Sequence, residues 1–193
     1  TALYEDHKGN IWVGTDGGVY IYNPKLDSFS AFNQVSNSGI CIKDFVTMIG
    51  GDEHNNIWIS VENQGLFSYR DVGKELTNYL GNSGLANVTR FWLSGKTCWL
   101  ALYADNLYYS KDNFKTALKP FRNSEGEEII KGDIINWQVN GPHNCVYVAS
   151  VNGLTEINQT SGKTRRLLNA YVRTLQFKSD DELWAGTETG LYI

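Results

Sequence analysis

Prolines, cysteines and long apolar runs are all scarce in this sequence, and each shortage narrows the class of protein. Three prolines beside nineteen glycines in 193 residues suit short strands joined by turns. No apolar run approaches the ~20 residues of a bilayer-spanning helix, and residues 1–6 lack a signal-peptide pattern. A net charge of −4 provides no basic surface, so we expect no contact with nucleic acid or with a membrane.

The three cysteines have no spacing typical of a metal or redox site. They are Cys41, Cys98 and Cys145, and their odd number leaves at least one thiol unpaired within the chain. Cys98 and Cys145 lie beside aromatic residues of predicted strands, which favours a role as small buried hydrophobes. We therefore expect no cofactor and no cysteine-bound metal.

What the sequence does contain is a repeat, in which a strand, a tight glycine turn and a second strand follow one another at residues 9–22. Four imperfect copies follow, 37 to 48 residues apart when aligned on one aromatic position. The aromatic anchors are Trp12, Trp58, Trp99, Tyr147 and Trp184. A period in the forties with several strands per unit is typical of a β-propeller blade.

Two further positions of the repeat have a physical interpretation. A small residue stands two places after each anchor and leaves room for a bulky side chain, plausibly from the adjacent blade: Gly14, Ser60, Ala101, Ala149 and Gly186. A turn glycine stands directly before the Val or Leu that starts the next strand, at Gly18, Gly65, Gly153 and Gly190. Asn106 replaces it once, and because Asn tolerates positive φ better than other non-glycine residues, a left-handed turn is predicted there.

The repeat predicts an all-β chain of about four and a half four-stranded antiparallel blades. Their bounds are roughly 1–40, 41–84, 85–128, 129–169 and an incomplete blade over 170–193. The predicted outermost strands are 28–32, 76–80, 118–121 and 164–168, and the last blade lacks one. We therefore expect an arc of a larger ring, with uncovered faces that make residues 1–193 poorly soluble in isolation.

The first copy resembles the two-component regulator propeller repeat. The match covers residues 5–15, the Gly17-Gly18-Val19 turn and the Tyr22-Asn23-Pro24 ending; residues 183–187 match well and residues 57–59 partly. The resemblance implies the periplasmic sensor region of a hybrid two-component system, with propellers of about seven blades and a following β-sandwich. It further implies a membrane helix, a histidine kinase outside this segment, an oligosaccharide ligand and a homodimer. The segment itself would not be an enzyme.

Candidate ligand residues lie where propellers usually bind, on the face that carries the turns between the second and third strands. Sugar recognition needs aromatic platforms with polar partners, and a guanidinium near the propeller axis needs a partner as well. The candidates are Glu62, Asn63, Arg90, Trp92, Tyr103, Asp105, Trp137 and Asn152. For Trp92 and Trp137, packing in the core is the stronger interpretation.

Two other functions remain open from the sequence. The propeller could be a scaffold for dimer or protein contacts, with the ligand bound elsewhere. Glu62 and Asp105 could form the carboxylate pair of a glycosidase or lyase, although turns favour acidic residues for local reasons. The three histidines, His7, His54 and His143, fall in turns of different blades, so no shared metal site is expected.

Overall fold

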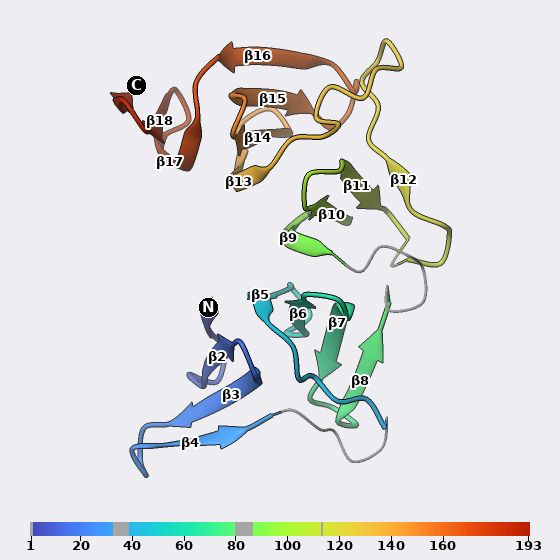
Figure 1. The fold of residues 1–193 in the computed structure, drawn as a ribbon, viewed down its shortest axis with the longest axis vertical. Coiled ribbons are helices and arrows are strands. Elements are labelled where there is room, and N and C mark those ends of the chain that lie inside the picture. Colours follow the sequence, from blue (N-terminus) through green and yellow to red (C-terminus); the bar gives the residue numbers. More distant parts are fainter. Residues whose placement is uncertain (1, 33–38, 80–86, 113) are drawn as a thin grey trace. The chain divides into compact units, whose positions relative to one another are not determined.

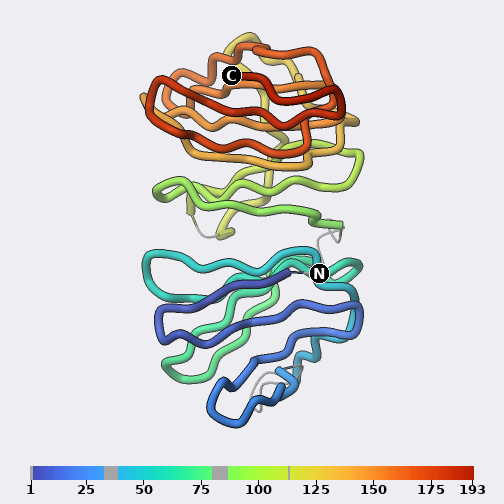
Figure 2. The backbone as a smooth tube through the Cα atoms, turned by 90° about the vertical axis from the view of Figure 1, so that its left-hand side faces the viewer, coloured from blue at the N-terminus to red at the C-terminus, as the bar shows by residue number. Residues whose placement is uncertain are grey.

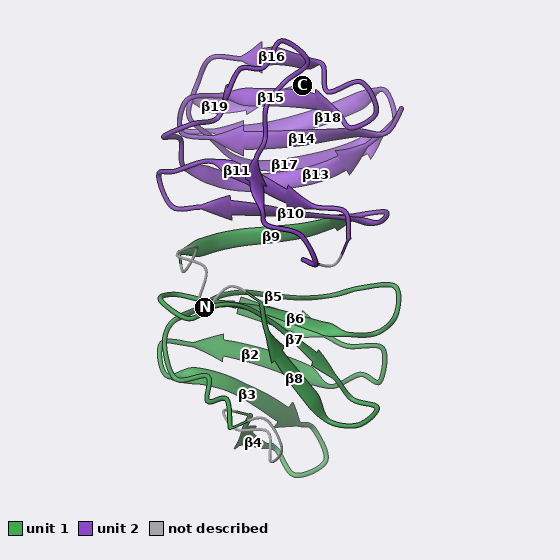
Figure 3. Ribbon diagram, turned by 90° about the vertical axis from the view of Figure 1, so that its right-hand side faces the viewer, with its two compact units in different colours: residues 1–93 green, residues 94–193 purple. Residues whose placement is uncertain are grey.

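The computed structural model describes residues 2–32, 39–79, 87–112 and 114–193, and the regular structure in these segments is β-strand. No described segment forms a helix that could cross a bilayer. The chain divides into two compact units, Thr1–Leu93 and Ser94–Ile193, coloured separately in Figure 3.

Unit 1 contains two four-stranded sheets whose strands follow one another in sequence order (Figure 1). The first consists of β1 (Ala2–Glu5), β2 (Ile11–Thr15), β3 (Gly18–Asn23) and β4 (Ser28–Ala31). The second consists of β5 (Val46–Gly51), β6 (Ile57–Val61), β7 (Gly65–Arg70) and β8 (Glu75–Asn78). All neighbouring strands in both sheets are antiparallel.

The third sheet begins with β9 (Val88–Ser94), within which the boundary between the units falls. It continues with β10 (Thr97–Leu102), β11 (Leu107–Ser110) and β12 (Lys119–Pro120). The fourth sheet is β13 (Ile135–Gly141), β14 (Cys145–Ser150), β15 (Leu154–Asn158) and β16 (Thr164–Leu168). The fifth has three strands, β17 (Val172–Ser179), β18 (Glu182–Thr187) and β19 (Gly190–Tyr192). Figure 2 traces these consecutive hairpins along the backbone. Such sheets are β-propeller blades, so the predicted fold class is confirmed.

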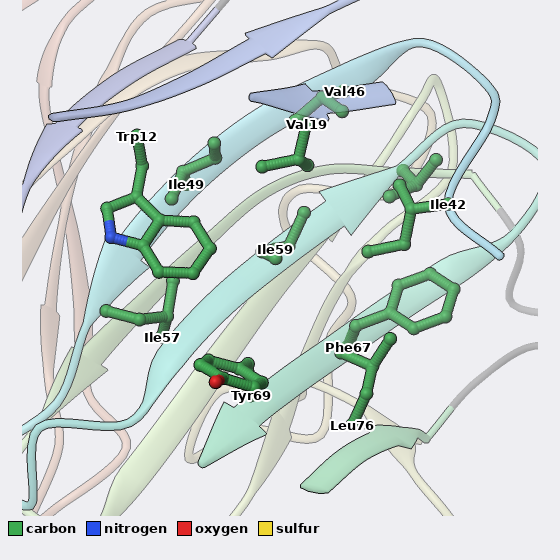
Figure 4. Close-up of a cluster of buried hydrophobic side chains, with 11 residues drawn as sticks. Trp12, Val19, Ile42, Val46, Ile49, Ile57, Ile59, Phe67, Tyr69 and Leu76 are labelled. Carbon is green, nitrogen blue, oxygen red and sulfur yellow. The ribbon is translucent and has the colours of Figure 1, made fainter. Parts of the chain in front are cut away.

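The core of unit 1 lies between its two blades (Figure 4). Trp12 of β2 is buried, with its ring edge-on to Phe32 at 4.7 Å between centroids and tilted against Tyr69 of β7 at 5.9 Å. Val19, Val46 and Ile59 are fully buried in the same cluster. The aromatic anchor thus packs on the neighbouring blade, as the repeat predicted, because a thin sheet lacks enough apolar area to form a core alone.

The small residue after the anchor makes room for the adjacent blade in the first repeat. A Cβ atom at Gly14 would lie 2.5 Å from Cγ1 of Val46 in β5, which is closer than two carbon atoms can approach. This confirms the prediction for blade one. In blade five, the equivalent Gly186 makes room instead for Thr174 of its own blade, whose Cγ2 would lie 2.8 Å from such a Cβ.

An aspartate holds the anchor tryptophan in each blade of unit 1. The Asp6 carboxylate accepts hydrogen bonds from the backbone N–H of Lys8 and Asn10, from Asn10 Nδ2 and from Trp12 Nε1, all at 2.9 Å. Asp52 repeats the arrangement with His54, Asn56 and Trp58 at 2.8–2.9 Å. One carboxylate therefore closes the turn and fixes the indole, which explains why the repeat places its Asp six residues before the Trp.

These hydrogen bonds control the acidity of the two aspartates. Burial by itself raises the pKa of Asp6 and of Asp52, but hydrogen bonds from the indole, the Asn side chain and the backbone outweigh burial, and both pKa values lie below the ordinary value. Hydrogen bonds to the ionised form favour it. The two turns are therefore stabilised by charged carboxylates.

The prediction for Asn106 is wrong. The turn glycines Gly18, Gly65, Gly153 and Gly190 have positive φ as expected, but Asn106 does not, and Ala104 takes the left-handed conformation in that turn (φ 49°). Ala104 corresponds to Asn63 of the β6–β7 turn, which is also left-handed (φ 60°), so the β10–β11 turn keeps this position and lacks the second left-handed residue that Gly65 provides in blade two. Asn106 instead uses its side chain, which accepts from Leu107 N at 2.8 Å and donates to Glu128 Oε2 at 3.2 Å.

Gly14→Ala tests the packing between the blades of unit 1. The added methyl group overlaps Val46, so we expect the free energy of unfolding to fall by about 1–3 kcal/mol, as in other overpacked cores. Gly17→Ala is the matched control, since a Cβ there meets nothing within 4 Å. Chemical denaturation of both variants measures the difference, and equal stabilities would contradict the packing described here.

Asp52→Asn tests the carboxylate that holds the anchor. The substitution replaces one carboxylate oxygen, which accepts hydrogen bonds, by an NH2 group that faces the N–H donors of the turn and the indole. We therefore expect the free energy of unfolding to fall by about 2 kcal/mol at neutral pH. Because the folded-state pKa is lowered, this contribution is present above the unfolded pKa of about 4 and disappears as the pH falls through the folded value. Denaturation between pH 7 and pH 3 measures it. Asp16→Asn, at an exposed turn position, should show no such loss. If the stability difference between Asp52→Asn and the parent protein did not change with pH, stabilisation by the ionised Asp52 carboxylate would be excluded.

Candidate functional site

The eight predicted ligand residues divide equally between the two compact units. Unit 1 contains Glu62, Asn63, Arg90 and Trp92, whereas unit 2 contains Tyr103, Asp105, Trp137 and Asn152. Glu62 and Asp105, the carboxylates considered for glycosidase or lyase chemistry, therefore lie in different units. Neither unit by itself brings that pair together.

The unit 1 candidates lie on a turn and on a strand. Glu62 and Asn63 are exposed in the β6–β7 turn, where Asn63 has a left-handed backbone (φ 60°). Arg90 is partly buried in β9, and burial lowers the pKa of its guanidinium. Trp92 is buried with only 7% of its surface exposed. This burial favours the packing interpretation of Trp92 over a stacking platform for a sugar.

The unit 2 candidates lie on three segments that backbone hydrogen bonds join. Gly132 N, in the connection between β12 and β13, donates to the carbonyl of Asp105 in the β10–β11 turn. Ile134 O, in the same connection, accepts from Val151 N in the β14–β15 turn at 3.0 Å. Tyr103 and Asp105, the start of β13 with Trp137, and Asn152 are therefore neighbouring segments at one end of the blades.

Two of these candidates are exposed aromatic residues: 62% of the surface of Tyr103 and 40% of the surface of Trp137 is exposed. The exposure of Trp137 differs from the core position that the sequence favoured. The strand explains it, because β13 is the first strand of its blade and residue 137 lies beside a register shift in its pairing with β14. Asp105 accepts a hydrogen bond from Tyr108 Oη at 3.1 Å, which fixes the turn on which Tyr103 lies.

Three residues that sequence reasoning did not select extend this region onto the fifth blade. The Arg173 guanidinium contacts Glu188 at 2.8 Å and lies 4.9 Å above the ring of Tyr171. Asn136 Nδ2 donates to Val172 O at 2.8 Å and joins β13 to β17. Glu188 occupies the same turn position as Glu62 and Asp105, and this recurrence is a signal by which the sequence could have identified it. Arg173 and Tyr171 had no signal in the repeat.

We call this region the unit 2 turn surface, and it consists of Tyr103, Asp105, Trp137, Asn152, Tyr171, Arg173 and Glu188. Exposed aromatic faces can stack on the apolar faces of sugar rings, while carboxylate, amide and guanidinium groups bind hydroxyls. The arrangement is therefore chemically suited to a neutral or weakly charged carbohydrate.

Other chemistry receives no support from the described residues. Across residues 2–32, 39–79, 87–112 and 114–193, no group of three or more His, Cys, Asp or Glu side chains could hold a metal ion. Cys98 and Cys145 are buried and Cys41 is exposed, which confirms the prediction that the first two pack as small hydrophobes. Burial raises the pKa of the Cys98 thiol to about 12, so this sulfur is not a nucleophile at neutral pH.

Comparison with known proteins agrees with this fold. Residues 1–17 match the family described as two component regulator propeller. Histidine kinase P4 of Formosa agariphila is 32% identical over 75 residues, an alignment that covers 35% of this chain and 5% of that protein. The match in sequence is therefore to a small part of a much longer kinase.

Two solved structures are similar over nearly the whole chain. One is the extracellular domain of a B. thetaiotaomicron protein, BT4673, described as a hybrid two-component system; it has 15% identity and a TM-score of 0.62, and the match covers 98% of this chain and 33% of that one. The other is PorZ of Porphyromonas gingivalis, described as a surface component of the type-IX secretion system, with 16% identity, a TM-score of 0.74 and coverage of 99% and 31%. At such identities the likeness establishes the fold.

The chain spans about a third of the length of the solved structures and a twentieth of the curated relative. The family match lies in the first blade, where the Asp6 carboxylate accepts the hydrogen bond of the anchor Trp12. The chain is therefore a set of β-propeller blades, and its residues 1–17 match the two component regulator propeller family, in agreement with the resemblance found in the first copy of the repeat.

Proposed function

We propose that this chain is part of the ligand-sensing propeller of a membrane-bound hybrid two-component regulator and that it recognises an oligosaccharide in the periplasm. The family repeat in residues 1–17 and the sequence similarity to a histidine kinase support the regulator assignment. The fold shared with an extracellular domain of a two-component protein supports the location. The kinase, the membrane helix and a following β-sandwich belong to other parts of such a protein.

The observation that carries the ligand class is the exposure of Trp137 and Tyr103 on the unit 2 turn surface. Large aromatic side chains normally bury their rings, and both rings here lie among groups that can bind hydroxyls. Arg173 and Glu188 neutralise each other, which leaves the Asp105 carboxylate as the remaining charge of the surface, so the surface suits a neutral polyhydroxyl ligand better than an anionic one. This segment binds and does not catalyse in the proposed function.

Signalling follows from differential affinity. A ligand shifts an equilibrium between two arrangements of the sensor only by as much as it binds one arrangement more tightly. A sugar on the turn surface would contact several blades at once, so its affinity would depend on how these blades are arranged. In a homodimer, the change would pass through the β-sandwich to the kinase.

Calorimetric titration of the complete sensor region with a panel of defined oligosaccharides tests the proposal. We expect one glycan to bind and Trp137→Ala to weaken that binding by ten-fold or more, since loss of an aromatic platform costs on the order of 1–3 kcal/mol. Phe29→Ala is the control, because Phe29 is also an exposed aromatic residue but lies on β4 in unit 1. Both variants should keep the melting temperature of the parent protein to within a few degrees.

A scaffold function is the second candidate, and exposed apolar residues at the outer edge of the first blade favour it. Leu26 and Phe29 are exposed at the β3–β4 hairpin, and β4 is an edge strand of its sheet, where another chain can pair. Normal glycan binding by Trp137→Ala, or no binding by any member of the panel, would favour the scaffold. Release of shorter sugars from the panel would instead identify a hydrolase or lyase.

A further inference from the structure

Unit 2 contains a pocket at the opposite end of its strands from the unit 2 turn surface. It has a volume of about 280 Å³, near the lower limit of roughly 300–1,000 Å³ for ligand pockets. Its lining comes from the beginning of β10, the segments that follow β11 and β12, and the β15–β16 turn. Asn152 of the turn surface lies just before the first residue of β15, whereas the pocket is lined by Asn158, the last residue of β15, and by the turn that follows it. The two regions are therefore at opposite ends of this strand.

The pocket lies where the third blade departs from the repeat. In blades one and two, a five-residue turn brings Asp6 or Asp52 to the anchor indole. The β9–β10 turn has only Gly95 and Lys96 between its strands, so no aspartate reaches Trp99. The anchor Trp99 and Thr97, the first residue after this turn, both line the pocket.

Gln159 of the fourth blade takes over the task of the missing aspartate. Its Oε1 accepts a hydrogen bond from Trp99 Nε1 at 3.1 Å, and its Nε2 donates to Ser94 Oγ at 2.7 Å and to Asn144 Oδ1 at 3.2 Å. A second bond, from Ser124 N to Gly162 O at 2.9 Å, joins the same two blades on another side. The walls of the pocket are therefore held together before any ligand arrives.

The floor of the pocket is aromatic. Trp99 contacts Tyr109 and Phe121 with 5.4 Å between ring centroids in each case. Trp99 and Phe121 are nearly fully buried, so they provide fixed apolar surface. A ligand resting on them can place one apolar face inward and direct its polar groups to the rim.

The rim offers hydrogen-bonding groups that the protein does not use. Within the described residues, the hydroxyls of Thr97, Tyr109 and Ser124 form no hydrogen bond, and Lys111 contacts only the Tyr109 ring, with its Nζ 5.4 Å from the centroid. Arg122 is already paired with Glu128. No carboxylate lines the pocket, so the Lys111 ammonium is its available charge.

We propose that this pocket binds a small polyhydroxyl carboxylate of the size of one sugar ring, such as a uronic acid. Lys111 pairs with the carboxylate, the three hydroxyls contact the ring hydroxyls, and the aromatic floor holds the apolar face of the ring. The site is independent of the oligosaccharide site, because it lies at the other end of the blades and uses none of the same residues.

Titration with D-glucuronate and with D-glucose tests whether the pocket binds a sugar ring and whether it prefers a ring that carries a carboxylate. We expect wild-type protein to bind glucuronate about ten-fold more tightly than glucose, since a charge-assisted contact is stronger than a neutral one. Lys111→Met should abolish that preference, whereas Lys115→Met, an exposed lysine near it that does not line the pocket, should keep it. Trp137→Ala should also keep it, which separates this site from the proposed oligosaccharide site.

A spectroscopic measurement locates the binding. In a ¹⁵N-labelled sample, glucuronate should shift one indole N–H resonance, and that resonance should be missing from Trp99→Phe. Absence of glucuronate binding at millimolar concentration would overturn the proposal. So would binding that persists unchanged in Lys111→Met, or a shift confined to the Trp137 indole.

Discussion

Burial of one aromatic side chain in each of the first four blades, with its polar edge hydrogen-bonded, is the constraint on which the rest of the fold depends. A four-stranded sheet is too thin to form its own core, so each anchor must pack on a neighbour, as Trp12 does against Tyr69. A buried indole N–H that lacks an acceptor would cost about 1–3 kcal/mol. Asp6 and Asp52 remove that cost and close the turns in the same interaction.

The later blades satisfy the same requirement by other means, and these differences are where function can enter. Trp184 donates to Glu182 of its own strand at 2.7 Å, Tyr147 donates to Glu156 at 3.3 Å, and Trp99 depends on Gln159 of the next blade. In the third blade the acceptor comes from another blade, and the β9–β10 turn has only two residues. Both partners of that hydrogen bond, Trp99 and Gln159, line the pocket in unit 2.

The two proposed sites use opposite ends of the same strands for different chemistry. The unit 2 turn surface offers exposed rings with a self-neutralised ion pair, whereas the pocket offers buried rings with one available ammonium group. Each site combines strand residues, Trp137 in one and Trp99 in the other, with side chains from the turns and connections beside them. The turns and connections can vary between blades with little loss of the core. This arrangement would let one small region respond to two ligands.

The sequence alone determined the repeat and the antiparallel order of its strands, because hydrophobic alternation and turn glycines are local signals. The outer strand predicted over 164–168 coincides with β16 (Thr164–Leu168), and the space beside Gly14 for a neighbouring residue was foreseen. Tertiary structure decided the rest. The left-handed residue of the β10–β11 turn is Ala104 rather than Asn106, and the Asn106 side chain bonds Leu107 N and Glu128 instead. Trp137 is exposed although tryptophan is a large, mainly apolar residue. Gln159 accepts a hydrogen bond from Trp99, 60 residues earlier in the chain, and such contacts between distant residues leave no periodic pattern in a single sequence.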